Sequence, residues 1–338
     1  MKAVRLVKAG TKATPELREE PLPTPGKHEV LIRVHAVSLN YRDTAVLRGE
    51  YPAKIKEDGI PISDGAGEVM AIGEGVSRVK PGDRIAVSCS TTWIGGPFVP
   101  EYHTGSVGFA IDGLLAESVV MNEQALVRIP DYMSYAEAAS LPCAAVTAWT
   151  ALNKIAPLQP GQTVLVQGTG GVSLFAVQFA KVFGARVLAI TSSDEKAAQL
   201  KELGVDAVVN YRTCPDWDHE ILALTDGKGV DQVIEIAGEK TIVKSAASTR
   251  VGGVISVIGF ASGFGGGLPP IDILTRGLTV TGSAIGPRLD FEAMLAAMAR
   301  HEVHPIIDRV YPFSKYHEAY RRLESGQQVG KVVIQVTD

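Results

Sequence analysis

The chain has 338 residues, of which 46% are hydrophobic and 21% are charged, and its formal net charge is −4. This length exceeds what one hydrophobic core normally serves, so about two domains are expected. The mild negative charge argues against nucleic acid or an anionic membrane surface as a partner, and no apolar run approaches the roughly 20 residues that span a bilayer.

The three cysteines, Cys89, Cys143 and Cys214, lie far apart and form no C-x-x-C pair. Their number and spacing predict neither a disulfide framework nor a four-cysteine zinc site. The N-terminus "MKAVRLVKAG" carries charges and no apolar signal core. We therefore expect a cytoplasmic protein.

The first 125 residues are typical of a β-rich domain. Residues 29–38 and 65–73 are rich in valine and isoleucine and are bounded by proline or glycine, as strands often are. The proline-rich stretch "TPELREEPLPTPGKHE" predicts a surface connection or an edge. In "KPGDRIAV" the Pro-Gly-Asp sequence predicts a turn that leads into a strand.

The pattern changes near residue 130. The alanine-rich stretch "SYAEAASLPCAAVTAWTALN" predicts a helix, and strand-like and helix-like runs then alternate. The strand-like runs are continuously apolar, which is typical of parallel strands buried on both faces. They are "TVLVQG", "ARVLAIT", "DAVVNY", "DQVIEIAG" and "GGVISVIG". This alternation predicts a doubly wound α/β domain.

The end of the chain is too short to form a core by itself. A glycine- and proline-rich linker, "ASGFGGGLPP", precedes a predicted helix, "DFEAMLAAMARHEV", and a final strand, "GKVVIQV". We therefore predict that a Rossmann-type dinucleotide-binding domain over residues 130–265 is inserted into a β-rich domain made of residues 1–129 and 266–338.

The stretch "VLVQGTGGVSLF" joins a predicted strand to a predicted helix through a glycine cluster. Residues 168–173 fit the pattern G-x-G-x-x-G except at the last position, where serine is still a small side chain. The first glycine permits the tight turn, and the second lets the backbone approach a pyrophosphate. We predict a dinucleotide cradle formed by Gly168, Thr169, Gly170, Gly171, Val172 and Ser173.

The tip of the next strand indicates which dinucleotide binds. An NAD site places an acidic side chain there, but this strand ends in Thr191, Ser192 and Ser193. Asp194 follows in a position that suits a helix N-cap. Lys196 lies one turn further on, and Tyr211 ends the third strand. The missing acid and the nearby cation together favour NADP(H), with Ser192, Ser193, Lys196 and Tyr211 at its phosphate.

From its first strand to "GKVVI" the chain resembles the medium-chain dehydrogenase/reductase superfamily, and within it the zinc-independent quinone oxidoreductase branch. The matching stretches include "VSLNYRD", "GEYP", "DGAGEV", "VKPGDRI", "AASLPCAAVTAWTAL", "GTGGVS" and "SSDEK". The resemblance implies that the β-rich domain is GroES-like and carries the catalytic residues. It also implies hydride transfer from NADPH to a quinone or an α,β-unsaturated carbonyl.

Alcohol dehydrogenases of that family bind a catalytic zinc through two cysteines and a His-Glu pair. The matching positions here are Asn40, Ser63-Asp64 and Cys143, and the structural-zinc segment contains only Cys89. We therefore expect no zinc and interpret Cys143 as a small apolar residue. His301 and His304 have helical spacing but no further ligand nearby in sequence, so they are interpreted as structural.

The resemblance also assigns residues to the site. It makes Asn40 the candidate hydrogen-bond donor to the substrate oxygen, and Tyr51 a proton donor or a lining residue of the cleft, although a core tyrosine is an alternative. It places Tyr41, Asp43 and Thr147 at the cofactor, and Asp43 alternatively caps a turn. We add Gly259 and Lys331 to the cofactor-binding set.

Two features leave the substrate open, and a third concerns the oligomeric state. Ala45 stands where some quinone reductases have a tyrosine, and Trp93 and Phe98 either shape the pocket or anchor a long loop. The strand in "GLTVTGSAI" resembles the edge through which family members form homodimers. The alternatives are a metal-free NAD(P)-dependent alcohol or aldehyde dehydrogenase, and a cofactor-binding structural or sensor protein with little turnover.

Overall fold

The computed structural model describes residues 1–337 and divides the chain into two compact units. The first unit contains Met1–Val146 and the segment from Ile285 onward, and the second contains Thr147–Ala284. One unit is therefore built from both ends of the chain. The boundaries lie later than the predicted 129/130 and 265/266, because α2 (Tyr135–Ala139) packs on strands of the first unit and β13 (Thr279–Gly282) extends the sheet of the second.

The first unit is organised around a largely antiparallel seven-stranded sheet with the order β14-β15-β3-β4-β5-β7, in which β6 also pairs with β3. A separate hairpin joins β1 to β2. Its strands are β1 (Lys2–Ala9), β2 (Lys12–Glu19), β3 (Glu29–Leu39), β4 (Asp64–Ile72), β5 (Arg84–Val87), β6 (Ser118–Asn122), β7 (Leu126–Arg128), β14 (Ile307–Pro312) and β15 (Lys331–Gln335).

The last strand explains how the chain's two ends form one core. β15 pairs antiparallel with β3 from Val332 opposite Leu39 to Gln335 opposite Ala36. Val332 and Ile334 join Ile32 and Leu39 in one buried cluster, where transfer of apolar side chains out of water stabilises the unit. The prediction that the tail packs back on the β-rich domain is confirmed.

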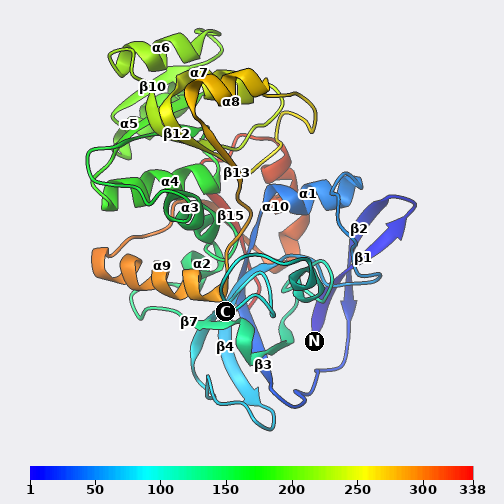
Figure 1. The fold of residues 1–338 in the computed structure, drawn as a ribbon. Coiled ribbons are helices and arrows are strands. Elements are labelled where there is room, and N and C mark those ends of the chain that lie inside the picture. The colour runs from blue at the N-terminus through cyan, green and yellow to red at the C-terminus, as the bar shows by residue number, and fades with distance from the viewer. Residues whose placement is uncertain (338) are drawn as a thin grey trace. The chain divides into compact units, whose positions relative to one another are not determined.

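The second unit contains a six-stranded parallel sheet with the order β10-β9-β8-β11-β12-β13. Figure 1 labels β10, β12 and β13 of this sheet. The chain enters this sheet at β8, moves outward through β9 to β10, and then continues with β11 on the other side of β8. The strand order therefore reverses between β8 and β11, which is the Rossmann arrangement. Its strands are β8 (Thr163–Gln167), β9 (Arg186–Thr191), β10 (Ala207–Asn210), β11 (Val230–Glu235), β12 (Thr249–Val257) and β13. The predicted doubly wound α/β domain is confirmed.

Helices separate the parallel strands as the alternating pattern predicted. In the second unit they are α3 (Ala144–Asn153), whose first turn belongs to the first unit, α4 (Gly171–Val182), α5 (Asp194–Glu202), α6 (Trp217–Leu224), α7 (Ile242–Ser248) and α8 (Pro270–Arg276). The first unit has α1 (Tyr41–Arg48), α2, α9 (Arg288–His301), α10 (Tyr316–Glu324) and short 3-10 turns at Pro100–Gly105, Glu123–Ala125 and Phe313–Lys315.

One predicted helix is in fact two. The alanine-rich stretch after residue 130 forms α2 and α3, separated by Ser140–Cys143. Pro142 causes the break, because the ring of a proline disfavours helical geometry at the residue before it. Cys143 therefore lies in a turn between two helices rather than inside one.

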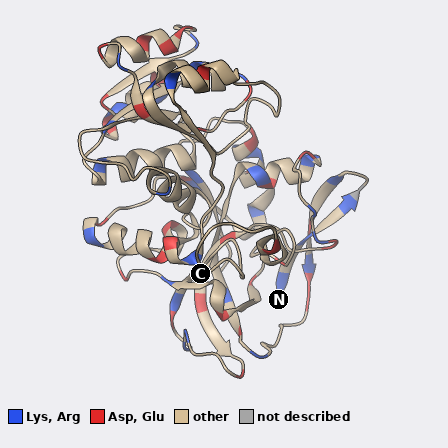
Figure 2. Cartoon of the chain, viewed as in Figure 1, with Lys and Arg blue, Asp and Glu red and all other residues tan. Residues whose placement is uncertain are grey.

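Charged residues of both signs are interspersed along both units (Figure 2). This distribution agrees with the small net charge of −4. Across residues 1–337, every helix falls short of the length and apolarity that crossing a membrane requires.

Candidate active site

The glycine-rich loop of the second unit follows β8, next to the point where the strand order of the sheet reverses. Gly168 has φ of +72°, and a side chain added at Gly168 or Gly170 would enter open space. Gly170 is the N-cap of α4 and makes no side-chain hydrogen bond to the amide groups at the start of this helix. Loop, open space and helix N-terminus together fit a dinucleotide pyrophosphate.

Ser173 holds the strand and the helix of this cradle together. Its side chain is fully buried and donates a hydrogen bond of 2.6 Å to the Gln167 carbonyl at the end of β8. A third glycine normally permits close packing at this position. Serine achieves the same close approach here and adds a hydrogen bond.

A buried polar network that the sequence pattern did not reveal lies beside the same loop, where β8 and β11 end. The carboxylate of Glu235 accepts hydrogen bonds from Gln167 Nε2 at 2.7 Å and from Thr241 Oγ1 at 2.6 Å. It also accepts from the Ser245 hydroxyl and from the amides of Ala237 and Gly238. A carboxylate with this many donors is fully compensated, so the network fixes the tips of β8 and β11 beside the cradle.

The tip of β9 differs from the prediction in one respect. Ser193, not Asp194, is the N-cap of α5, since its Oγ accepts the Lys196 amide at 3.3 Å. Asp194 instead accepts a hydrogen bond from Asn210 Nδ2 at 2.8 Å. Ser193 takes the N-cap position because it is the last residue with extended backbone before α5, which is where an N-cap lies.

The residues predicted to bind an extra phosphate lie at one edge of the sheet. Thr191 of β9 is opposite Asn210 of β10, and the Tyr211 amide donates to the Thr191 carbonyl at 2.9 Å. Tyr211 is exposed, and Ser192 and Lys196 are half-buried. Ser192, Lys196 and Tyr211 therefore lie close together in the fold, and their contact with NADP(H) stays a prediction.

Two other predicted cofactor residues of the second unit have clear structural surroundings. The backbone of Gly259 lies so close to Ile236, the residue after β11, that an added Cβ would lie 2.3 Å from the Ile236 carbonyl oxygen. Thr147 is buried in α3. The packing alone requires glycine at position 259.

In the first unit, Asn40 stands at the junction between β3 and α1. Its Oδ1 accepts a hydrogen bond from Lys331 Nζ at 2.6 Å, and the same ammonium donates to the Leu39 carbonyl at 2.8 Å. An ammonium group can only donate, so this contact fixes which end of the amide is oxygen. Within residues 1–337 the buried Asn40 Nδ2 has no hydrogen-bond partner.

Lys331 therefore orients Asn40. The side chain is only 3% exposed, and its Nζ lies 3.8 Å from Asp64 Oδ2 in addition to the two oxygens above. These contacts give Lys331 a role in positioning Asn40, and its contact with the cofactor stays a prediction.

Asp43 caps α1, as its alternative interpretation predicted. Its Oδ2 accepts the Asn40 amide at 2.7 Å, and burial raises the pKa of this carboxyl to about 6 against the lowering effect of Arg42. Tyr41, the first residue of the helix, is exposed, and the Arg48 guanidinium lies 5.7 Å from its ring centre.

Tyr51 packs in a small apolar cluster beside α1. Its ring lies 5.1 Å from that of Phe109, over which the Arg42 guanidinium is placed at 4.9 Å. Burial raises the pKa of the Tyr51 phenol. The structure thus gives Tyr51 the packing of a core residue, on the side of the cluster that faces Arg42.

The sequence pattern did not reveal the network around Arg42. The guanidinium is almost enclosed and donates to Ser63 Oγ and, at 3.3 Å, to Cys89 Sγ, and it lies 3.6 Å from Asp64 Oδ1. Asp64 is fully buried and also accepts the Cys143 amide at 3.1 Å. The motif "NYRD" contains this arginine, but no spacing rule indicates that it points at residues 63, 64 and 89.

The donor atoms of Asp64, Cys89 and Cys143 lie within 4.8 Å of one another, a set that could in principle ligate zinc. Two cations already face these atoms, because Arg42 contacts Asp64 and Cys89 and Lys331 lies beside Asp64. A divalent ion there would lie next to two buried positive charges. The residues present therefore do not fit the family's catalytic zinc.

The pKa values of the two cysteines in this network are shifted in opposite directions. Burial raises the pKa of the Cys89 thiol well above its usual value. A hydrogen bond from that thiol lowers the pKa of Cys143, and the charge of Arg42 acts in the same direction. The interpretation of Cys143 as a purely apolar residue is therefore wrong, since it lies among charged and polar groups.

The long loop after β5 is anchored by its own aromatic side chains. Trp93 is buried, its ring centre lies 5.0 Å from that of Phe98, and its Nε1 donates to the Gly96 carbonyl at 3.0 Å. His304 Nδ1 lies 2.6 Å from Glu137 Oε1, which explains this histidine without a metal. These contacts support two interpretations: Trp93 and Phe98 anchor the long loop, and His304 has a structural role.

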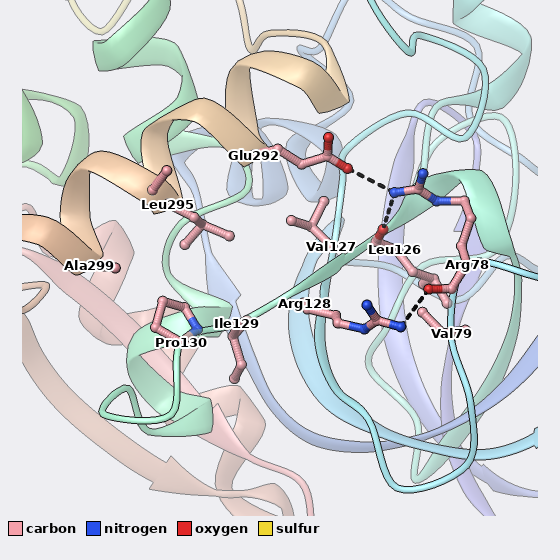
Figure 3. A pocket seen from close by; sticks show the side chains of 11 residues that line it. Arg78, Val79, Leu126, Val127, Arg128, Ile129, Pro130, Glu292, Leu295 and Ala299 are labelled. Atoms are coloured by element: carbon pink, nitrogen blue, oxygen red, sulfur yellow. Dashed lines mark hydrogen bonds and ion pairs between the residues drawn. The ribbon is translucent and has the colours of Figure 1, made fainter.

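A separate groove of about 530 Å³ lies between β7 and α9 (Figure 3). Apolar side chains form much of its lining, and Arg78 Nη2 pairs with Glu292 Oε1 at 2.8 Å at its rim. None of the predicted site residues lines it. It is therefore a different feature from the Asn40 site.

Known proteins agree with this arrangement. An alcohol dehydrogenase GroES-like domain model matches residues 26–131, and a zinc-binding dehydrogenase model matches residues 171–300. A zinc-type alcohol dehydrogenase-like protein of Schizosaccharomyces pombe is 39% identical over 314 residues, covering 91% of each chain. A solved NAD-dependent alcohol dehydrogenase is 34% identical with a TM-score of 0.91, covering 100% of both chains.

Two further solved structures, at lower identity, are described by the cofactor or the substrate of those proteins. A mycobacterial protein solved in complex with NADPH is 27% identical, with a TM-score of 0.82 over 99% of this chain and 100% of that one. A quinone oxidoreductase of Pseudomonas syringae pv. tomato is 26% identical, with a TM-score of 0.82 over 99% of each chain.

Proposed function

The chain belongs to the medium-chain dehydrogenase/reductase superfamily of oxidoreductases, and from this premise we propose that it reduces a quinone or an α,β-unsaturated carbonyl with NADPH and without a metal. The observation that carries the proposal is the Asn40 amide, whose Nδ2 lacks a partner within residues 1–337 while Lys331 fixes its Oδ1. A pre-oriented, unused donor suits a substrate oxygen that gains negative charge.

Bound NADPH would supply the hydride, and the acceptor's conjugation makes it electrophilic without a Lewis acid. Asn40 then has one task, which is to donate a hydrogen bond to the oxygen where charge develops. Lys331 restricts the amide to the productive orientation, so no rotation is needed as charge appears. The proton that completes the reduction comes from solvent or from the Tyr51 phenol.

The second candidate is a metal-free NAD(P)-dependent alcohol or aldehyde dehydrogenase. The observation in its favour is that one similar protein is described as zinc-type alcohol dehydrogenase-like and a similar solved structure as an NAD-dependent alcohol dehydrogenase. An isolated alcohol needs a base or metal to remove its proton before hydride can leave. The Asn40 amide provides neither, which is why the conjugated acceptor is preferred.

The test is steady-state oxidation of NADPH by the purified protein before and after treatment with a strong chelator. We expect turnover with enones or quinones, at an unchanged rate after chelation and with no stoichiometric zinc in the protein. Loss of activity on chelation that added zinc restores would overturn the metal-free mechanism. Turnover confined to simple alcohols and NAD(P)⁺ would favour the second candidate.

The preference for NADPH rests on the tip of β9, where Lys196 lies near Ser192 and Tyr211. We expect Lys196→Ala to raise the dissociation constant of NADPH about tenfold, or about 1.4 kcal/mol, and to leave that of NADH unchanged. Fluorescence titration with each nucleotide measures both. Lys201→Ala, on the last turn of the same helix, is the matched control. Equal losses for the two nucleotides, or tighter NADH binding by the unmodified protein, would refute the NADPH preference.

We also propose a homodimer that forms through the edge of the second unit. β13 ends the six-stranded sheet, pairs only with β12 among the described residues, and has largely exposed side chains, including Val280. An exposed edge with unpaired backbone groups suits pairing with a second copy. Sedimentation would measure this against the 35.8 kDa of one chain. The chain has an odd number of cysteines at scattered positions, and on this ground we also propose a cytoplasmic location.

A further inference from the structure

We propose that Cys89 and Cys143 form a reversible disulfide when a hydroperoxide oxidises the protein. Their sulfur atoms and an Asp64 carboxylate oxygen all lie within 4.8 Å of one another, in the first unit. The cysteines are 54 residues apart in sequence (143 − 89), so only the fold brings them together. This modification is independent of the proposed reductase activity.

The environment of the pair distinguishes an attacking sulfur from a resolving one. Cys89 is buried and keeps its proton, while Cys143 is half-buried and has the lowered pKa. Arg42 and Lys331 supply positive charge around Cys143, and Asp64 opposes them. A thiolate is the nucleophile toward peroxides, and nearby cations favour it.

The chemistry balances with hydroperoxide as the oxidant. The Cys143 thiolate attacks one peroxide oxygen, the O–O bond breaks, and hydroxide or alkoxide leaves, which makes Cys143 a sulfenic acid. The Cys89 sulfur then attacks the Cys143 sulfur, the S–O bond breaks, and water leaves with the Cys89 proton. Two sulfurs are each oxidised by one electron, and the peroxide takes up both electrons.

Both cysteines lie outside helices and strands, so they can approach each other. Cys89 follows β5 in a bend, and Cys143 lies in the turn that Pro142 creates between α2 and α3. Forming the bond requires the sulfurs to close to about 2.05 Å. A shift in a turn is less costly than one inside a sheet or a helix.

The experiment treats the full-length protein with stoichiometric hydrogen peroxide and then counts free thiols and measures intact and peptide mass. We expect the loss of two of the three thiols and a mass lower by two hydrogen atoms. Peptides containing residues 89 and 143 should be linked, and dithiothreitol should reverse the change. Cys214→Ser should behave as the unmodified protein does, because Cys214 lies by itself in the other unit.

Two variants test the order of events. Cys89→Ser should accumulate a Cys143 sulfenic acid that dimedone traps, and Cys143→Ser should leave Cys89 reduced under the same dose. The proposal is overturned if Cys214 is the cysteine that oxidises first. It is equally overturned if Cys143 proceeds to sulfinic acid while Cys89 stays reduced, or if the disulfide links two chains. These masses do not depend on the activity, so a failed reductase assay leaves them interpretable.

Discussion

Replacing Asn40 with alanine is expected to lower kcat about 100-fold, because a preorganised donor to a developing oxyanion normally contributes that much. The dissociation constant of NADPH should change by no more than about twofold, since Asn40 is assigned to the substrate oxygen. Stopped-flow measurement of NADPH oxidation and fluorescence titration separate the two effects. The prediction rests on the buried Nδ2 atom, which has no partner within residues 1–337.

Two further variants show whether the donor or the packing is responsible. Asn40→Asp keeps an oxygen for Lys331 but loses the N–H donor, so its rate should fall as far as that of Asn40→Ala. Asn122→Ala removes a half-buried asparagine of the same unit that caps the turn at Glu123–Ala125, and its rate should be unchanged. An unchanged kcat in Asn40→Ala would remove the role assigned to this residue.

Local patterns were sufficient for the architecture of the second unit. The central strands β8 and β9 are buried on both faces, so they appear in the sequence as nearly unbroken apolar runs, and the helices between the strands restrict the topology. Gly168 and Gly170 were identifiable because a tight turn and an open cradle both require residues without side chains. Pro142 could also have indicated the break between α2 and α3, but the alanine-rich residues on both sides favoured the prediction of a single helix.

Long-range side-chain contacts were not predictable in the same way. The contact of Lys331 with Asn40 was not predictable, because nothing in "GKVVI" indicates the pairing of β15 with β3 that places the ammonium on Asn40. Arg42 and Cys89 are separated by 47 residues, and Glu235 collects donors from β8 and α7. Such networks depend on strand register and rotamers, which a single sequence does not encode in any local spacing.

Replacing Arg42 with methionine is expected to lower the free energy of unfolding by about 3–5 kcal/mol, because it leaves the carboxylate of Asp64 buried with weaker compensation. Although burial acts to lower it, the pKa of the guanidinium is raised by Cys143, Cys89 and Asp64, so the group is charged at every relevant pH. After its removal, Lys331 at 3.8 Å is the nearest cation to Asp64. Urea denaturation followed by circular dichroism measures the change.

Arg48→Met is the matched control, because this arginine lies on the same helix and pairs with Glu50 at 2.7 Å from a side chain that is 35% exposed. An exposed pair of this kind contributes at most about 1 kcal/mol. The double variant Arg42→Met with Asp64→Asn should recover part of the lost stability, since the uncompensated charge is then gone. If Arg42→Met costs no more than Arg48→Met, the Arg42 network does not hold the first unit together, and the argument that two buried cations exclude zinc from Asp64, Cys89 and Cys143 loses its main support.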